Sequence, residues 1–232
     1  MFTVEGFEKA LKYWDMFEEG LICTLSLSFL TVILGFVLAL VLAFMRMSKI
    51  WPFKAFASIY VEIFRATPLL VQLFIVYYVL LGDIDFPTIK LFGFIRFERF
   101  IPGVIALALN SGAYLSEIIR SGIQSIELGQ TEASRSLGLS HWQTMRHIVI
   151  PQAIKNILPA IANEFVTIIK ESSICYTIGV AEIMAAVNSI GGAIFRLNEA
   201  LIIAACVYFC LTFPTSKIIA YFERRMSRGD RR

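Results

Sequence analysis

The chain has 232 residues, of which 57% are hydrophobic, 13% aromatic and only 17% charged. A soluble domain is usually about 45–50% apolar and about 25% charged, so this composition excludes an ordinary soluble globular protein and a disordered chain. The formal net charge of +3 is small and scattered along the sequence. It excludes a nucleic-acid-binding protein, which needs a dominant basic face. The composition indicates an integral membrane protein.

Five segments are apolar enough to cross a membrane as helices. A bilayer core about 30 Å thick needs about 20 helical residues. We therefore predict an all-α integral membrane fold with five transmembrane helices in one domain, residues 1–232. The predicted spans are 21–45, 56–81, 100–120, 156–174 and 200–221, with a kink at Pro214 in the last.

Two apolar segments are too short or too polar to be spans. Residues 183–195 are uncharged but number only 13, which predicts a re-entrant or interfacial element. In residues 1–20, Phe7, Leu11 and Trp14 recur at helical spacing, without the basic region that begins a signal peptide. We expect an external interfacial helix there, with a loosely ordered leader as the alternative.

The distribution of Lys and Arg predicts the orientation, because these residues accumulate in cytoplasmic loops. The five spans place twelve of them on one side of the membrane and six on the other. We therefore expect the N-terminus outside and the C-terminus in the cytoplasm. The twelve are Arg46, Lys49, Lys54, Arg120, Arg135, Arg146, Lys155, Arg224, Arg225, Arg228, Arg231 and Arg232.

The cytoplasmic loop over residues 122–155 is long, polar and patterned. Residues 130–137 predict a short helix that ends at Gly138, where a C-terminal glycine belongs. Ser140 begins an S-x-x-Q capping box, so a second short helix is expected over residues 140–148. Two short helices that meet at an angle form a rigid projection suited to docking into a groove of another protein.

This loop resembles the EAA loop, E-A-A-x3-G-x9-I-x-L-P, of ATP-binding-cassette (ABC) importer permeases. Residues 132–151 follow the pattern, with Ser134 in place of the third Ala and Ile150 in place of Leu. Other segments resemble the branch of the family that imports polar amino acids, the histidine, glutamine and arginine type. These segments are residues 64–72, 110–117 and 163–173, and the resemblance covers residues 17–225.

The resemblance implies the type I ABC importer permease fold in a bacterial plasma (inner) membrane. It implies a second permease subunit, identical or paralogous, two ABC ATPase subunits that bind ATP, and an extracytoplasmic binding protein that delivers the amino-acid substrate. The second helix of the loop would be the coupling helix, seated in a cleft of the ATPase. The residues then expected to couple to the ATPase are Glu132, Ala133, Gly138, Ser140, His141, Trp142, Thr144, Met145 and His147.

Trp142 is the candidate anchor of that contact. Exposed aromatic residues on short helices are a common type of interface hot spot. The alternative is that Trp142 belongs to the aromatic belt and packs toward lipid headgroups.

The chain itself is not expected to be an enzyme or to carry a cofactor. It lacks the G-x-x-x-x-G-K-[ST] loop that holds nucleotide phosphates. His141 and His147 both lie in the loop, and no acid is placed to orient either of them for Ser-His-Asp catalysis. Cys23, Cys175, Cys206 and Cys210 show neither disulfide nor metal-ligand spacing.

Polar residues form one stripe on the third predicted span and another on the fourth. A charge inside a membrane costs about 2.5–3.5 kcal/mol on insertion scales, so such residues usually face the bundle interior. Each residue alone is explained more readily by interhelical hydrogen bonding, but the two stripes together favour a path for a zwitterion. The pathway residues are Asn110, Tyr114, Glu117, Asn163, Glu164, Thr167 and Lys170.

The predicted function is therefore the membrane subunit of an ATP-driven importer of a polar amino acid. The alternative is an ion-coupled secondary transporter or channel, which the intramembrane charges permit. Against it, no inverted repeat or pair of interrupted helices is visible in the sequence.

Overall fold

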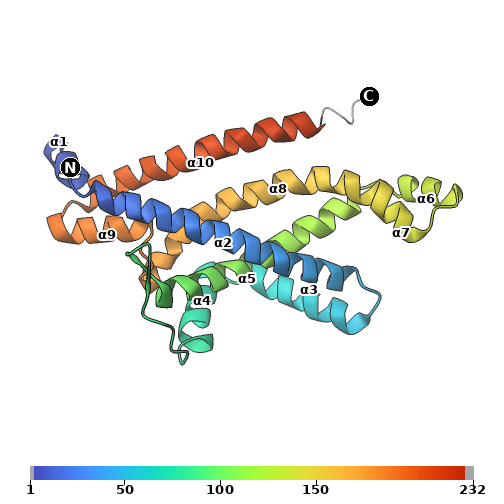
Figure 1. The fold of residues 1–232 in the computed structure, drawn as a ribbon, viewed down its shortest axis with the longest axis horizontal. Coiled ribbons are helices and arrows are strands. Elements are labelled where there is room, and N and C mark those ends of the chain that lie inside the picture. Colours follow the sequence, from blue (N-terminus) through green and yellow to red (C-terminus); the bar gives the residue numbers. More distant parts are fainter. Residues whose placement is uncertain (1–2, 228–232) are drawn as a thin grey trace.

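The computed structural model describes residues 3–227, which form an elongated bundle of helices (Figure 1). Three helices are long and apolar enough to cross a membrane, and the number rises to five if each of two bent helix pairs counts as one span. Arg228, Arg231 and Arg232, which entered the orientation argument, lie outside the described residues.

The N-terminal residues form a short helix, α1 (Val4–Leu11), followed at once by the long helix α2 (Trp14–Met47). Residues 14–20, expected in an external segment, are therefore the first turns of the first long helix. Ala10 and Phe17 are buried against Ile183 and other apolar residues of α9 and α10, defined below. The N-terminal segment thus packs against the C-terminal part of the chain.

The second predicted span is not one helix. It consists of α3 (Trp51–Ala66), then α4 (Leu69–Phe74), which continues as a π-helix, η1 (Ile75–Leu80). The two parts meet at an angle of 111°. Thr67 at the corner is extended (φ −112°, ψ 147°) because it precedes Pro68, and a residue before proline disfavours the helical conformation.

The next segment contains a hairpin that the sequence did not predict. Strands β1 (Lys90–Leu91) and β2 (Ile95–Arg96) pair antiparallel, with Lys90 opposite Arg96. They lead into α5 (Phe97–Gln124), which lies against α2 over much of its length. Gly112 of α5 allows this close approach, because a Cβ there would lie 2.7 Å from the side chain of Leu38.

The loop after α5 forms α6 (Leu128–Ser136) and α7 (His141–Thr144). From α7 the helix continues without interruption through the π-helix η2 (Met145–Val149) into α8 (Ile150–Glu171). The expected end of the second loop helix, ahead of Pro151, is therefore wrong. Pro151 lacks the N–H that an α-helical bond would use, and the π-turn directly before it accommodates that gap.

The C-terminal third folds back along α8. A 3₁₀-helix, η3 (Ser172–Ile178), extends α8, and α9 (Ile183–Ile194) meets this extended helix at 48°. α9 is the short element expected at residues 183–195. α10 (Leu197–Ser227) is one helix that contains Pro214, and most of its apolar surface is not covered by the rest of the chain. In Figure 1 it forms one side of the bundle.

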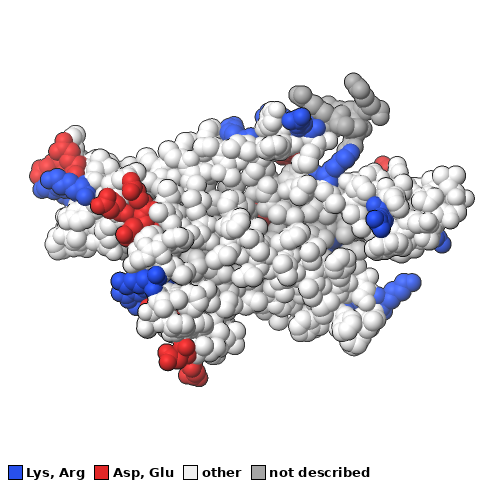
Figure 2. Space-filling model, in the orientation of Figure 1, with Lys and Arg blue, Asp and Glu red and all other residues white. Residues whose placement is uncertain are grey.

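Charged residues gather at the two ends of the bundle (Figure 2). On the face shown, the end that carries α1 has both acidic and basic residues, and the end that carries α6 and α7 has mainly basic ones. The middle of this face is almost free of charge. The two ends of this face thus differ in charge, with the basic excess at the α6–α7 end.

Candidate functional site

The joint between α6 and α7 is built by local hydrogen bonds. Gly138 has φ +87°, a conformation that favours glycine, and the Leu139 N–H donates to the Ser134 carbonyl at 3.2 Å. The capping box predicted at Ser140 is present. Its hydroxyl accepts from the Gln143 N–H at 3.2 Å, and the Gln143 side chain accepts from the Ser140 N–H at 2.7 Å.

A buried pair of hydroxyl groups connects the two helices of this joint. Ser134 of α6 is hydrogen-bonded to Thr144 of α7 with 3.0 Å between the oxygens, and both side chains are buried. The Ser134 hydroxyl also donates to the Thr131 carbonyl at 2.8 Å. Ser134 is the position where the EAA pattern has its third alanine. The residue that departs from the pattern therefore adds a contact that alanine does not make.

The surface of α6 and α7 presents several apolar side chains to the exterior. Trp142 is 67% exposed, and Leu128 and Leu137, at the two ends of α6, are 79% and 81% exposed. Glu132, Ala133, His141 and His147 are exposed on the same two helices and η2. We call these seven residues the docking surface.

Thr144 and Met145, which the sequence analysis expected to couple to the ATPase, are not among these exposed residues. Thr144 is buried in the joint, and Met145 lines an apolar cavity beneath it, together with Ile119 and Ile150. Leu128 and Leu137 were missed by the sequence analysis. The available signal was a leucine at each end of a helix that is otherwise polar and lacks an apolar stripe.

The residues predicted to line a path on α5 lie in separate environments. Asn110 is buried, and its amide donates to the Gln72 side-chain oxygen of α4 at 2.8 Å. Gln72 in turn donates to the carbonyls of Phe64 and Thr67, at 2.7 and 3.0 Å. Asn110 thus holds the corner of the broken second span, and its partner Gln72 was not identified from the sequence.

The other two residues of the α5 stripe are engaged by arginines. Tyr114 has the Arg65 guanidinium over its ring, 5.7 Å from the ring centroid. Glu117 forms ion pairs with Arg46, at the end of α2, and with Arg120. These contacts link α5 to α2 and α3, so the residues of the α5 stripe mainly hold neighbouring helices together.

The α8 stripe contributes directly to a polar cavity. Thr167 and Lys170 line a cavity of about 800 Å³, whereas Asn163 is exposed and Glu164 is half-buried outside that lining. The cavity combines one cation and one acid, Lys170 and Glu171, with apolar and aromatic walls. Its other lining residues are Leu69, Ser173, Ile174, Tyr176, Met184 and Tyr208. We call it the polar cavity.

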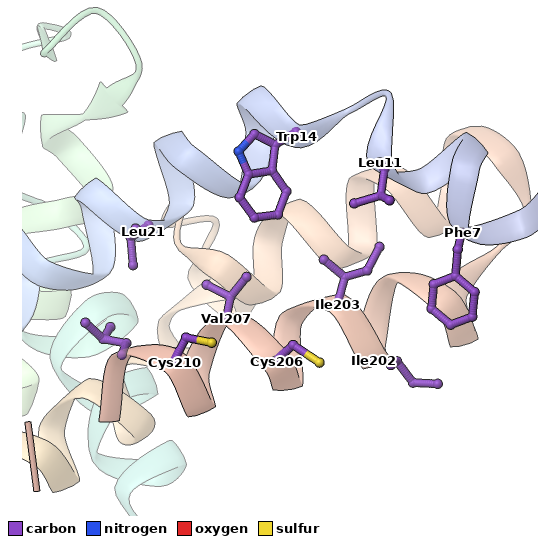
Figure 3. Close-up of a pocket in the computed structure, with 10 residues that line it drawn as sticks. Phe7, Leu11, Trp14, Leu21, Ile202, Ile203, Cys206, Val207 and Cys210 are labelled. Carbon is purple, nitrogen blue, oxygen red and sulfur yellow. The ribbon is translucent and has the colours of Figure 1, made fainter. Parts of the chain in front are cut away.

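A second cavity, of about 540 Å³, lies between α1, the start of α2 and α10. Figure 3 shows its lining residues, with Ile203, Cys206, Val207 and Cys210 of α10 facing the side of Trp14. The residues described as lining it are aliphatic, aromatic or cysteine. It therefore offers no partner for the charges of an amino acid, and the polar cavity is the better candidate site.

Among residues 3–227, no group of three or more His, Cys, Asp or Glu side chains is arranged to hold a metal ion. The bundle of apolar helices, the open polar cavity at its surface and the rigid projection at one end are features expected of a membrane transport component.

The comparison with known families identifies the kind of transport component. Residues 21–228 match the family model described as the binding-protein-dependent transport system inner membrane component. The chain belongs to this family, and it is a multi-pass protein of the bacterial inner membrane.

Individual relatives cover nearly the whole chain. The arginine transport system permease protein of Bacillus subtilis is 40% identical over 212 residues, which span 91% of this chain and 93% of that protein. A putative glutamine transport system permease protein of Rickettsia typhi is 39% identical over 208 residues, 90% of this chain and 91% of that protein.

A solved structure is similar as well. The crystal structure of an amino acid ABC transporter with histidines contains a chain that is 45% identical, with a TM-score of 0.87, and it covers 97% of this chain and all of that chain. This match shows that the helices described above form the permease fold of ABC importers.

Proposed function

We propose that this chain is the membrane-spanning permease subunit of an ABC importer that translocates a polar amino acid across the inner membrane. The relatives named for arginine and glutamine transport support this substrate class. Separate ATPase subunits supply the energy, and the pathway opens to one side at a time. We further propose that residues 1–232 form a single membrane domain, with the N-terminus outside and the C-terminus in the cytoplasm.

One structural feature carries the proposal: a single helix connects the docking surface to the polar cavity. From His141 to Ile178 the helix has no break. Trp142 and Lys170 are 28 residues apart on it, which corresponds to about 42 Å at 1.5 Å per residue. A displacement imposed on α7 by a partner therefore moves the wall of the cavity. This is how ATP binding elsewhere opens and closes the pathway.

The polar cavity has the charges that an amino-acid backbone requires. The Lys170 ammonium is a partner for the substrate carboxylate, and the Glu171 carboxylate is a partner for its ammonium group. The neighbouring aromatic and aliphatic walls, from Tyr176 and Tyr208 to Ile174, leave room for a side chain. This chain contributes no catalytic group and no cofactor, and ATP binds to the partner subunits.

The proposed partners are those that the family implies. The docking surface binds an ABC ATPase subunit, with Trp142 as its anchor. A second permease subunit, identical or paralogous, completes the pathway, and an extracytoplasmic binding protein delivers the amino acid.

The first experiment purifies the tagged protein in mild detergent from its native host, with everything bound to it, and measures ATPase activity. We expect an ATPase subunit to co-purify and to be lost when Trp142→Ala is combined with Glu132→Ala. Trp51→Ala is the matched control, because Trp51 is an exposed tryptophan that belongs to α3 and not to α6 or α7. If the chain purifies alone and moves amino acids into liposomes under an ion gradient without ATP, the proposal is wrong.

A second experiment separates this proposal from an ion-coupled transporter. The Gly138→Pro variant cannot keep the φ of +87° between α6 and α7, since proline requires about −65°. An ABC importer then loses coupling and stops transporting, whereas a secondary transporter changes little. Unaltered uptake by this variant would contradict the coupling role of the joint.

A further inference from the structure

Glu182 is a fully buried acid that takes no part in the sites described so far. Its side chain is 0% exposed, and it lies between the turn at Gly179 and the first residue of α9. A buried carboxylate is costly unless hydrogen-bond donors surround it. The Ala185 N–H in the first turn of α9 donates to it at 2.9 Å and the Tyr208 hydroxyl of α10 at 2.8 Å, and the Met184 N–H is a further donor.

The start of α9 is also held from its other side. Gly20 of α2 approaches so closely that a Cβ there would lie 2.9 Å from the Cα of Ile183. Glu182 therefore has a fixed place between α2 and α10, with the first turn of α9 bound to its carboxylate.

Tyr208 connects this buried acid to the polar cavity. Its hydroxyl points to Glu182, with the buried Thr24 of α2 as a second polar neighbour, while Tyr208 also lines the cavity. Because the Tyr208 hydroxyl is hydrogen-bonded to the buried Glu182, the aromatic ring is the part of Tyr208 that can face the cavity. Met184, two residues after Glu182 and in the first turn of α9, lines the same wall.

We propose that Glu182 is a positioning residue for substrate recognition: it fixes the Tyr208 ring, together with Met184, as one wall of the polar cavity. Glu182 does not contact the substrate. The inference rests on the proposed function, in which the polar cavity binds the transported amino acid. It identifies what holds Tyr208 and Met184 in the lining that also contains Lys170 and Glu171.

The test uses the complete transporter, with its ATPase and binding protein, in proteoliposomes. ATP-dependent uptake of radiolabelled arginine and of radiolabelled glutamine gives KM and kcat. Glu182→Gln keeps the size of the side chain and an oxygen for the Ala185 N–H, but its amide N–H can only donate to the Tyr208 hydroxyl, so the bond is reversed and becomes neutral. We expect KM to rise by up to about tenfold, the effect of weakening a charge-assisted hydrogen bond, with kcat changed less than about twofold.

Tyr208→Phe tests the same link from the other side and does not depend on the folding of a Glu182 variant. It removes the hydroxyl and keeps the ring, and we expect a similar rise in KM. If Glu182 acts through Tyr208, adding Glu182→Gln to the Tyr208→Phe variant raises KM by less than about a further twofold. Tyr221→Phe, at an exposed site further along α10, is the matched control and leaves KM unchanged.

Three results overturn the inference, each in a different way. Additive effects of Glu182→Gln and Tyr208→Phe on KM mean that Glu182 does not act through Tyr208. An unchanged KM with a lowered melting temperature means that the buried acid only stabilises the fold. If the unaltered transporter takes up neither probe nor any other polar amino acid with ATP, the proposed function fails together with this inference. Normal uptake with a KM that neither variant changes removes this inference alone.

Discussion

The docking surface and the polar cavity are built in opposite ways. The joint under the docking surface is held by bonds between residues close in sequence, such as Ser134 and Thr144, ten positions apart. The cavity collects its wall from segments as distant as Leu69 and Tyr208. The first structure is therefore encoded locally, and the second exists only when five helical segments are packed together. A substitution in one region should leave the function of the other intact, because the docking surface and the polar cavity have no residue in common. Only the helix between them connects the two.

The largest expected effect comes from the cavity. Lys170→Gln removes the proposed partner of the substrate carboxylate, and a hydrogen bond to a charged group is worth about 1.5–3 kcal/mol. We expect kcat/KM for uptake to fall about 10- to 100-fold, while the ATPase still co-purifies in the normal amount. Lys217→Gln is the control, since Lys217 lies over the Phe213 ring on α10, away from the cavity. Loss of ATPase binding in Lys170→Gln would mean that the two regions are not separable.

The second prediction concerns the corner that supports the cavity near Leu69. Gln72→Leu leaves the buried Asn110 amide and the Phe64 carbonyl without this partner. An unsatisfied buried polar group costs about 1–3 kcal/mol, so the midpoint of thermal unfolding in detergent should fall clearly. Gln130→Leu, on the exposed surface of α6, should leave it nearly unchanged. Equal stability of the two variants would show that the Asn110–Gln72 pair does not hold the corner.

The same contrast explains which features could be predicted from the sequence alone. Gly138 and the capping box at Ser140 were predictable because each signal lies within a few residues of the structure that it produces. The break at Pro68 was visible in principle, but it stands in an apolar run long enough to suggest one continuous span. The pair of Glu182 and Tyr208, 26 positions apart, follows from no local pattern, because only the packing of α9 against α10 brings them together.

The third prediction returns to the docking surface. Leu137 is 81% exposed, so nothing in this chain is lost when it becomes polar. If it packs against the ATPase, Leu137→Ser removes apolar area worth about 1–2 kcal/mol, and binding of the purified ATPase should weaken about 5- to 30-fold. KM for uptake should stay unchanged. Normal binding by this variant would confine the contact to Trp142 and its neighbours on α7.

The smallest expected effect tests whether local bonds alone define the joint. Ser134→Ala restores the residue that the EAA pattern has at this position, but it removes the partner of the buried Thr144 hydroxyl. A neutral hydrogen bond contributes about 0.5–1.5 kcal/mol, while the Leu139 N–H bond to the Ser134 carbonyl and the turn at Gly138 do not depend on the side chain. ATPase binding should therefore weaken by about 2- to 10-fold at most. Thr144→Val combined with Ser134→Ala should restore it, because neither hydroxyl is then left unpaired. A loss well beyond tenfold in Ser134→Ala, without recovery in the pair, would mean that Ser134 itself contacts the partner and that the joint is shaped by the complex as well as by its own sequence.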